Sequence, residues 1–477
     1  MSGFKEYGDY DALGLAELVR NKDVTPDELL DEAIERTERL NPDLNAVTHK
    51  HYDRAKKQIA NGLPDGPFKG VPYLLKDLHL LLEGTPTTSG SKLFKDNIAD
   101  HNSTLTDRYL AAGLVLYGKT NTPEFGLTTT TEPQMFGQCH NPWNLDHSTG
   151  GSSGGAGSAV AARILPMAHA SDGGGSIRIP AAANGLFGIK PTRARTPTGP
   201  DRGEGWNGSS ISHAVSLTVR DNAALLDASE GPAEGDIYAA PAKAGPFLDA
   251  VSKDPGKLKI GFSTRTPMGT PLHPECRTAV EETAKLLADL GHDVEEAWPD
   301  YEPIEVMSAL VAFIATHTAA TITLRAEALG VTLKEDQVEK QTWAFYQMAQ
   351  EADVVNYARA QYWQQKAARD LGAFFSKYDA FVQPMLGTPP CKLGWMDMNS
   401  DDMETYIERI GIYSPFTALY NITGSPSMNV PLHWSADGLP VGTMITAGFG
   451  QDATLFSLAG QLEKAKPWID KRPPNCA

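Results

Sequence analysis

The sequence is poor in several features that mark other classes of protein. It has four cysteines in 477 residues, and none of them forms a C-x-x-C pair or a zinc-ligand spacing. We therefore expect no metal site and reduced thiols, as in the cytoplasm. Basic residues are also scarce, with 42 lysines and arginines against 59 aspartates and glutamates. The net charge of −17 disfavours nucleic acid and anionic membranes as partners.

Long apolar runs are rare as well. The first 20 residues carry early acidic residues and no apolar core of the length that a signal peptide needs. Residues 306–324 contain no Asp, Glu, Lys or Arg and are about long enough to span a bilayer. They also contain four threonines, a serine and His317, which favours a buried core helix over a membrane segment. We expect a cytoplasmic protein that does not bind membranes.

Strand patterns alternate with helix patterns along the whole chain. Buried strands are predicted within residues 71–82, 112–120 and 164–172, and a β-α-β unit within residues 257–297. Residues 302–376 have a mainly helical pattern that is rich in aromatic side chains. No repeat, low-complexity tract or linker interrupts the sequence. We therefore predict one α/β domain over residues 1–477, with a core at about 61–300 and 377–477 and a mainly helical region at about 302–376.

Glycine, by contrast, is concentrated around serines in two clusters, "GGSSGG" at 150–155 and "DGGGS" at 172–176. A phosphate-binding loop does not fit, because no G-K-[ST] follows and the strand-turn-helix context of G-x-G-x-x-G is missing. The pattern G-x-S-x-G at 151–155 would make Ser153 the nucleophile of an elbow motif. That motif requires a preceding hydrophobic strand, whereas residues 141–150 read as a polar loop.

A third interpretation combines both clusters with one lysine. Lys76 lies inside an apolar strand pattern, where burial would lower its pKa and leave the amine neutral. A neutral lysine can accept the proton that a serine must lose to become nucleophilic. Ser152 would relay this proton from Ser176, which follows a predicted strand and three glycines. The backbone N–H groups that would hold the oxyanion belong to Gly173, Gly174, Gly175 and Ser176.

The two clusters and the lysine together resemble the amidase signature family. "GGSSGG", "DGGGSIRIPA" and "GPFKGVPYLLKDL" carry the resemblance, and "GKTNTPEFG", "FGQCHNPWNL" and "GLFGIKPTRAR" extend it over most of the chain. It implies a Ser–cis-Ser–Lys triad in which Ser176 is the nucleophile, Ser152 the bridging serine after a cis bond from Gly151, and Lys76 the base. It also implies a central mixed β-sheet surrounded by helices, with no metal and no organic cofactor.

The activity that this resemblance implies is amide hydrolysis through an acyl-enzyme. The substrate would be a small molecule with an uncharged amide bond, among them anilide, oligoamide and carbamate bonds. Within the family, "VPYLLKDL", "TTEP" and "NPWNL" are most similar to 6-aminohexanoate cyclic-dimer hydrolases, although aryl-acylamidases, peptide amidases and carbamate-cleaving members share much of this pattern. A homodimer is a further expectation.

Two alternatives to a free-standing hydrolase are considered. One is the glutamine-hydrolysing subunit of a tRNA-dependent amidotransferase, but such subunits tend to read "GGSIRQP", whereas Ile179 follows Arg178 here. The other is a non-catalytic binding protein, which we would expect to lack a member of the triad.

Two departures from the family pattern concern the substrate. Gly173 follows Asp172 where a threonine is common, which predicts a looser oxyanion loop. The loop "GLTTTTEP" is rich in threonine where many members carry "MGSST". Selectivity is expected from this loop and from the aromatic-rich helices. The expected substrate contacts are Gly126, Leu127, Thr128 and Thr129.

Charged neighbours of the motifs have structural interpretations. Arg178 is expected to pair with Asp172 and hold the second glycine loop. Asp77 is not expected to pair with Lys76, because neighbours along a strand point to opposite faces. The histidines near the motifs, including His79 and His169, read as ordinary polar residues.

Overall fold

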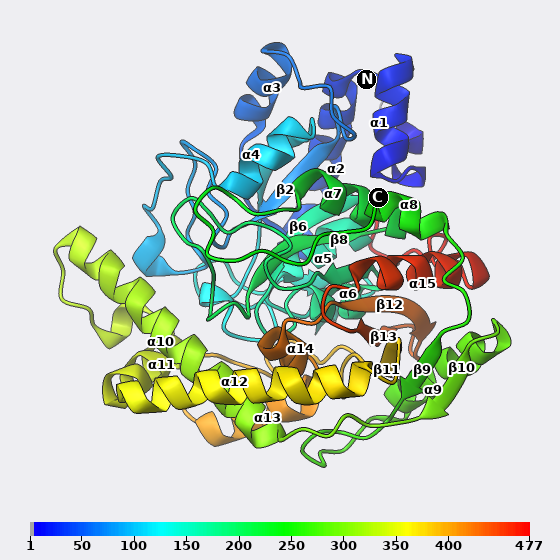
Figure 1. Cartoon of the computed structure of the whole chain (residues 1–477). Coiled ribbons are helices and arrows are strands. Elements are labelled where there is room, and N and C mark those ends of the chain that lie inside the picture. The colour runs from blue at the N-terminus through cyan, green and yellow to red at the C-terminus, as the bar shows by residue number, and fades with distance from the viewer. Residues whose placement is uncertain (1–3) are drawn as a thin grey trace.

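An eight-stranded mixed sheet lies at the centre of the molecule, which the computed structural model describes from residue 4 to residue 477. Its strand order is β10-β9-β11-β13-β12-β7-β8-β6. The first three strands run parallel and the other neighbours pair antiparallel. Helices surround the sheet (Figure 1), which confirms the predicted fold class. The strands are β6 (Met167–Asp172), β7 (Phe187–Lys190), β8 (Ile211–Ser216), β9 (Lys259–Phe262), β10 (Asp293–Glu296), β11 (Ala380–Pro384), β12 (Ser427–Trp434) and β13 (Pro440–Ala447).

A second, three-stranded sheet carries Lys76. Its order is β1-β3-β2, with β1 spanning Val47–Lys50, β3 Val115–Thr120 and β2 Pro72–Lys76. Every residue of β2 and β3 is buried, as the continuous apolar pattern predicts for strands covered on both faces. Because β2 also packs beside β6, its last residue reaches the large sheet.

Two buried helices made largely of small residues follow the glycine clusters. They are α5 (Gly154–Ala161) and α6 (Arg178–Asn184), and they pack against each other. At the start of α5 the chain approaches other backbone closely, and a Cβ on Gly155 would lie 2.4 Å from the backbone nitrogen of Asn121. Glycine is therefore required here by close packing, which accounts for part of the first cluster.

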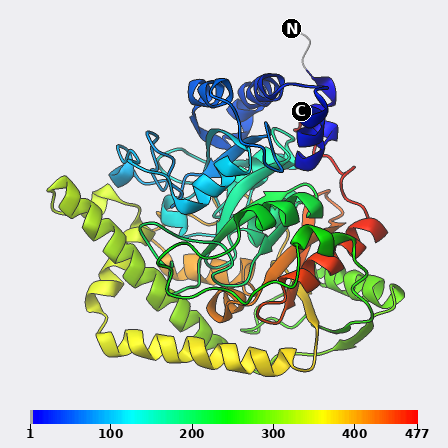
Figure 2. The same ribbon diagram turned by 45° about the horizontal axis from the view of Figure 1, so that its top comes forward.

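Three helices occupy most of residues 302–376 and form one side of the molecule (Figures 1 and 2). They are α10 (Pro303–Leu329), α11 (Lys340–Glu351) and α12 (Val354–Phe375). By length and composition α10 would also qualify as a membrane span, and 44% of its most apolar window is buried inside the molecule. Its buried residues pack against α11, α12 and α14 (Ala418–Thr423), as a core helix does.

Side-chain caps fix the first turn of several of the remaining helices. In α2, for example, the Glu28 N–H donates to Thr25 Oγ1 at 3.2 Å and the Thr25 N–H donates to the Glu28 carboxylate at 2.8 Å. A short hairpin of β4 (His140–Asn141) and β5 (Asn144–Ser148) stands where a polar loop was predicted. The other helices are α1 (Ala12–Asn21), α2 (Pro26–Leu44), α3 (Tyr52–Ala60), α4 (Thr104–Ala111), α7 (Val219–Ser229), α8 (Phe247–Ser252), α9 (Pro274–Asp289), α13 (Met403–Tyr413) and α15 (Asp452–Ala465).

Candidate active site

Lys76 ends strand β2 with its side chain fully buried. Its Nζ donates to Ser152 Oγ at 2.7 Å and to Ser171 Oγ on β6 at 3.1 Å. Burial lowers the pKa of this ammonium to about 7, against the opposing effect of the Asp172 carboxylate. A substantial fraction of Lys76 is therefore neutral near pH 7 and able to accept a proton.

Asp77 does not pair with Lys76, as the alternation of side chains along a strand predicts. Its carboxylate instead accepts the Thr88 N–H at 2.9 Å, together with the Thr88 hydroxyl, and lies 3.2 Å from His49 Nε2. The Asp77 carboxylate thus has its hydrogen-bond partners on the face of the strand opposite to Lys76. The Lys76 amine instead contacts the hydroxyl groups of Ser152 and Ser171.

Ser152 is buried and follows a cis peptide bond from Gly151, the configuration that the family resemblance implies. The loop after β3 packs directly on this segment. A Cβ on Gly151 would lie 2.4 Å from the backbone oxygen of Thr130, and a Cβ on Gly126 would lie 2.9 Å from Ser152 Oγ. Only glycine permits both approaches, so the glycines allow the loop to cover the bridging serine.

The four residues expected to contact substrate divide into two pairs. Gly126 and Thr129 keep part of their surface exposed, whereas Leu127 and Thr128 are buried. Leu127 belongs to the apolar core beneath the helical region. The Thr129 hydroxyl donates to Met396 Sδ at 3.4 Å. Of this loop, Gly126 therefore lies nearest to the reacting groups, because it faces Ser152.

Ser176 lies in the turn between β6 and α6 and keeps part of its surface exposed. The first glycine cluster packs on helix α6, which follows Ser176, since a Cβ on Gly150 would lie 3.1 Å from the backbone oxygen of Ile179. Within the described chain no hydrogen bond joins Ser176 to Ser152 or to Lys76, so the relay between the two serines stays a prediction. Both serine segments meet in the same region of the molecule.

Asp172 and Arg178 form a buried ion pair beneath this turn, as expected. The guanidinium donates to both carboxylate oxygens at 2.9 Å, and both side chains are fully buried. Burial by itself would raise the pKa of Asp172, but the charge and hydrogen bonds of Arg178 hold that pKa well below its usual range. The carboxylate therefore stays ionised and fixes the turn.

The Asp172 carboxylate also reduces the number of backbone N–H groups that are free to bind an oxyanion. The Gly175 N–H donates to Asp172 Oδ1 at 2.7 Å, so the prediction that Gly175 supplies an oxyanion donor is wrong in this structure. Among residues 4–477, the N–H groups of Gly173, Gly174 and Ser176 donate to no hydrogen-bond acceptor. Gly175 is instead required by the conformation of the turn, because its φ of +136° is one that L side chains rarely adopt.

Removing the Asp172 carboxylate should destabilise the fold. We expect Asp172→Ala to lower the free energy of unfolding by about 3–5 kcal/mol, because it leaves Arg178 buried without its charge partner. Since the fold lowers the pKa of Asp172, this contribution is complete at neutral pH and is lost only as the pH falls below about 4, the unfolded value.

Urea denaturation at pH 7 measures this effect. Asp100→Ala is the matched control, because that aspartate pairs with His101 on the surface and its removal should change the urea midpoint far less. Equal effects of the two substitutions would contradict a structural role for the buried pair.

Two groups beside Lys76 were not predicted. His169 Nδ1 accepts the backbone N–H of Lys76 at 3.1 Å, and Ser171 Oγ accepts its ammonium. Burial and the neighbouring charge of Lys76 lower the pKa of His169, so this imidazole is neutral. A signal for both was present, because residues two apart on a strand share a face and both belong to the strand before Ser176.

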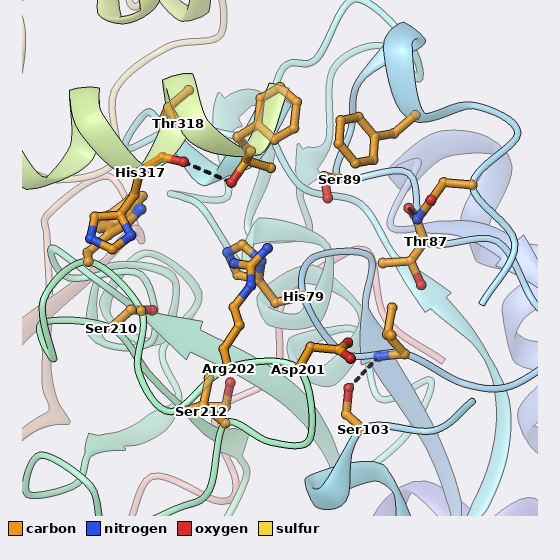
Figure 3. Close-up of a pocket in the computed structure, with 18 of the residues that line it drawn as sticks. His79, Thr87, Ser89, Ser103, Asp201, Arg202, Ser210, Ser212, His317 and Thr318 are labelled. Carbon is orange, nitrogen blue, oxygen red and sulfur yellow. Dashed lines mark hydrogen bonds between the residues drawn. The ribbon is translucent and has the colours of Figure 1, made fainter. Parts of the chain in front are cut away.

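A cavity of about 140 Å³ lies next to the loops that carry the candidate groups (Figure 3). Its walls come from the segment after β2, the loop at residues 198–212, Phe125 and α10. The aromatic side chains that line the cavity do not come from the helices at residues 302–376, where they were expected. Of residues 302–376, His317, Thr318 and Thr321 line the cavity, and no aromatic residue of α11 or α12 does within the described chain.

Groups that would hold a metal ion do not gather anywhere in residues 4–477. No three His, Cys, Asp or Glu side chains come together there in a ligand arrangement.

Comparisons with known proteins agree with this arrangement. A sequence model of the family described as Amidase matches residues 28–456. The 6-aminohexanoate-cyclic-dimer hydrolase of Paenarthrobacter ureafaciens is 38% identical, covering 97% of this chain and 96% of that protein. A putative amidase AmiC of Mycobacterium leprae is 34% identical, covering 97% of this chain and 96% of its own.

Solved structures give the same result. A 6-aminohexanoate cyclic dimer hydrolase complexed with substrate superposes with a TM-score of 0.92 at 35% identity, covering 98% of this chain and 99% of the other. A bacterial aryl acylamidase superposes with a TM-score of 0.87 at 28% identity, covering 96% of both chains. The glycine-wrapped serines and the buried lysine thus occur in a chain that belongs to the amidase signature family.

Proposed function

We propose that this chain is a serine amidohydrolase in which Ser176 is the nucleophile, Ser152 relays its proton and Lys76 is the base. The observation that supports it most is the buried 2.7 Å hydrogen bond from Lys76 Nζ to Ser152 Oγ. A lysine whose pKa is lowered to about 7 by burial can take up a proton at neutral pH. Histidine, the usual base, is then not needed.

In the proposed reaction, Ser176 Oγ attacks the amide carbonyl while its proton passes to Ser152 Oγ, whose own proton passes to Lys76 Nζ. The N–H groups of Gly173, Gly174 and Ser176 bind the oxyanion. The proton returns through Ser152 to the leaving nitrogen, the C–N bond breaks and the amine departs. Water then attacks the ester by the same relay, which releases the acid and restores Ser176.

The elbow alternative, with Ser153 as nucleophile, fits less well. Ser153 is fully buried, and its hydroxyl contacts the backbone of Ser171, donating to the carbonyl and accepting from the N–H at 3.3 Å each. The strand before it, β5, is polar and partly exposed, whereas the elbow requires a hydrophobic strand. Ser153 thus has a local structural role in this proposal.

The proposed substrates are small molecules with neutral amide bonds, namely anilides, oligoamides and carbamates. We expect the enzyme to cleave a nitroanilide, an aryl carbamate and aminohexanoate amides, with kcat/KM for glutamine at least about 100-fold lower. The reason is that the carboxylates near the cavity are already engaged, Asp201 with His101 and Glu204 with Tyr238. The α-ammonium of glutamine would find no free partner there, and any contact of its α-carboxylate with Arg202 would bring this ammonium beside a second positive charge.

A substrate panel with kcat/KM for each compound tests this expectation. If glutamine were the best substrate, and only after a partner protein was added, the amidotransferase alternative would replace this proposal. The buried, apolar Ile179 stands against that alternative, because those subunits tend to carry glutamine at this position.

We further propose a cytoplasmic location and a homodimer, with neither nucleic acid nor a membrane as partner. The four cysteines are all unpaired, as suits a reducing compartment. Sedimentation equilibrium measures the oligomeric state directly, and a monomer at micromolar concentration would contradict the homodimer.

A further inference from the structure

The cavity is lined by neighbours of the candidate groups, although Lys76, Ser152 and Ser176 do not themselves line it within the described chain. Phe125 lines it and precedes Gly126, which abuts Ser152. Trp206 lines it and packs over the nucleophile loop, where a Cβ on Gly173 would lie 2.6 Å from the indole ring. His79 lines it three residues after Lys76. These neighbours make the cavity the space into which the remote part of a substrate bound at Ser176 would extend.

Arg202 supplies the one guanidinium on the cavity wall. Its side chain points toward His79, while the neighbouring Asp201 side chain points away from it (Figure 3). Within residues 4–477 no carboxylate lies within ion-pairing distance of this guanidinium, and no acceptor forms a hydrogen bond with it. An arginine that faces a binding cavity with its donors free is suited to an anionic ligand.

The acidic residues of the same loop, Asp201 and Glu204, have other hydrogen-bond partners. Asp201 Oδ2 lies 3.1 Å from His101 Nε2, and Glu204 accepts a hydrogen bond from the Tyr238 hydroxyl. The other titratable groups on the cavity are His79 and His317, whose pKa values burial lowers, so both imidazoles are neutral at pH 7. The charge of Asp201 still raises the pKa of Arg202, against the larger effect of burial, which lowers it. Within the described chain, however, no carboxylate forms an ion pair with this guanidinium, and neutral imidazole and hydroxyl groups line the cavity around it.

We propose that Arg202 binds a carboxylate at the end of the substrate remote from the scissile amide. A carboxylate matches the planar, forked donors of a guanidinium and can form two parallel hydrogen bonds. The inference rests on the proposed amide hydrolysis and deepens it. Among neutral amide bonds, the enzyme prefers those in open-chain compounds that end in a carboxylate over cyclic or methyl-terminated compounds of similar size.

Matched pairs of anilides test the acyl side. Mono-4-nitroanilides of dicarboxylic acids with four to six carbons are compared with the nitroanilides of the corresponding monocarboxylic acids. We expect kcat/KM to be about 10–100-fold higher for the best carboxylate compound, as for a hydrogen bond to a charged group. Arg202→Met should remove this preference, because it should lower kcat/KM for the carboxylate compounds about 10–100-fold more than for the methyl-terminated ones.

A second comparison tests the leaving-group side of the amide, with an N-acyl 6-aminohexanoate and the corresponding N-acyl hexylamine as substrates. The comparison that shows the preference identifies which half of the substrate contacts Arg202. Arg359→Met is the matched control, because this exposed arginine on α12 carries the same charge and does not line the cavity. It should leave the preference unchanged, whereas Arg202→Lys should keep part of it.

The outcomes separate this inference from the proposed function. If the wild type cleaves both members of each pair equally, or if Arg202→Met slows both equally, the carboxylate site is wrong and amide hydrolysis stands. If no anilide is cleaved, or Ser176→Ala cleaves as well as the wild type, the proposed function itself fails. A preference that survives 1 M salt and Arg202→Met would place the carboxylate elsewhere.

Discussion

Replacing Ser176 with alanine should reduce kcat on the order of 10⁴-fold or more, because only binding and oxyanion stabilisation would remain. The substitution removes one hydroxyl group from a partly exposed turn, so the fold should be retained. Release of 4-nitroaniline measures the rate, and thermal melting measures the stability. A slowly hydrolysed aryl carbamate should also leave its acyl group on the wild-type peptide that contains Ser176, which peptide mass spectrometry detects.

Ser153→Ala is the matched control for this result. Its hydroxyl makes only two 3.3 Å contacts with the backbone of Ser171, so we expect activity within about 10-fold of the wild type. If Ser153→Ala were inactive and Ser176→Ala active, the elbow motif would be the correct interpretation. If the acyl group were found on another residue, the assignment of the nucleophile would be overturned.

Replacing Lys76 with methionine should reduce kcat by about 10²–10⁴-fold, the range typical for loss of a general base. In the wild type the neutral amine is the active form, and the pKa of Lys76 is about 7. Activity should therefore be complete well above pH 7, half-maximal near pH 7, and fall about tenfold per pH unit at lower pH. Lys76→Met should lose this dependence, which a pH profile of kcat/KM measures.

Lys76→Arg provides a second variant, because it keeps a positive charge that cannot be released at neutral pH. It should be as inactive as Lys76→Met if the base role is correct, whereas a role for the charge alone would leave it active. EDTA should have no effect on the wild type. Loss of activity in EDTA that zinc restores would contradict the mechanism.

The parts of the fold that depend on local pattern follow from the sequence. The continuous apolar run that ends at Lys76 predicts a strand buried on both faces, and β2 is one. The strand before the second glycine cluster was predicted for the same reason, and β6 is that strand. Lys76 could be singled out because an isolated charge in a buried strand must be paired or neutral.

Contacts between distant segments were not visible in the sequence. Asn421, for example, donates to the Asp172 carboxylate at 2.8 Å and accepts from Arg178 at 2.6 Å, although it lies more than 240 positions away. The cavity was also missed, because the loop that carries Arg202 has no periodic pattern. The hydrogen bond from the Gly175 N–H to Asp172, by contrast, could have been predicted, because an aspartate often accepts N–H groups from residues a few positions ahead.

The position of the last strands in the large sheet has a consequence for biosynthesis. Strands β12 and β13, made from residues 427–447, lie between β11 and β7, and α14 holds the loop of Asp172 through Asn421. A ribosome-bound chain that ends near residue 400 carries all three triad residues, yet it lacks the centre of its sheet and the support of the nucleophile turn. Nascent chains should therefore remain inactive until the C-terminal segment emerges, and fragments split near residue 400 should gain activity only when mixed.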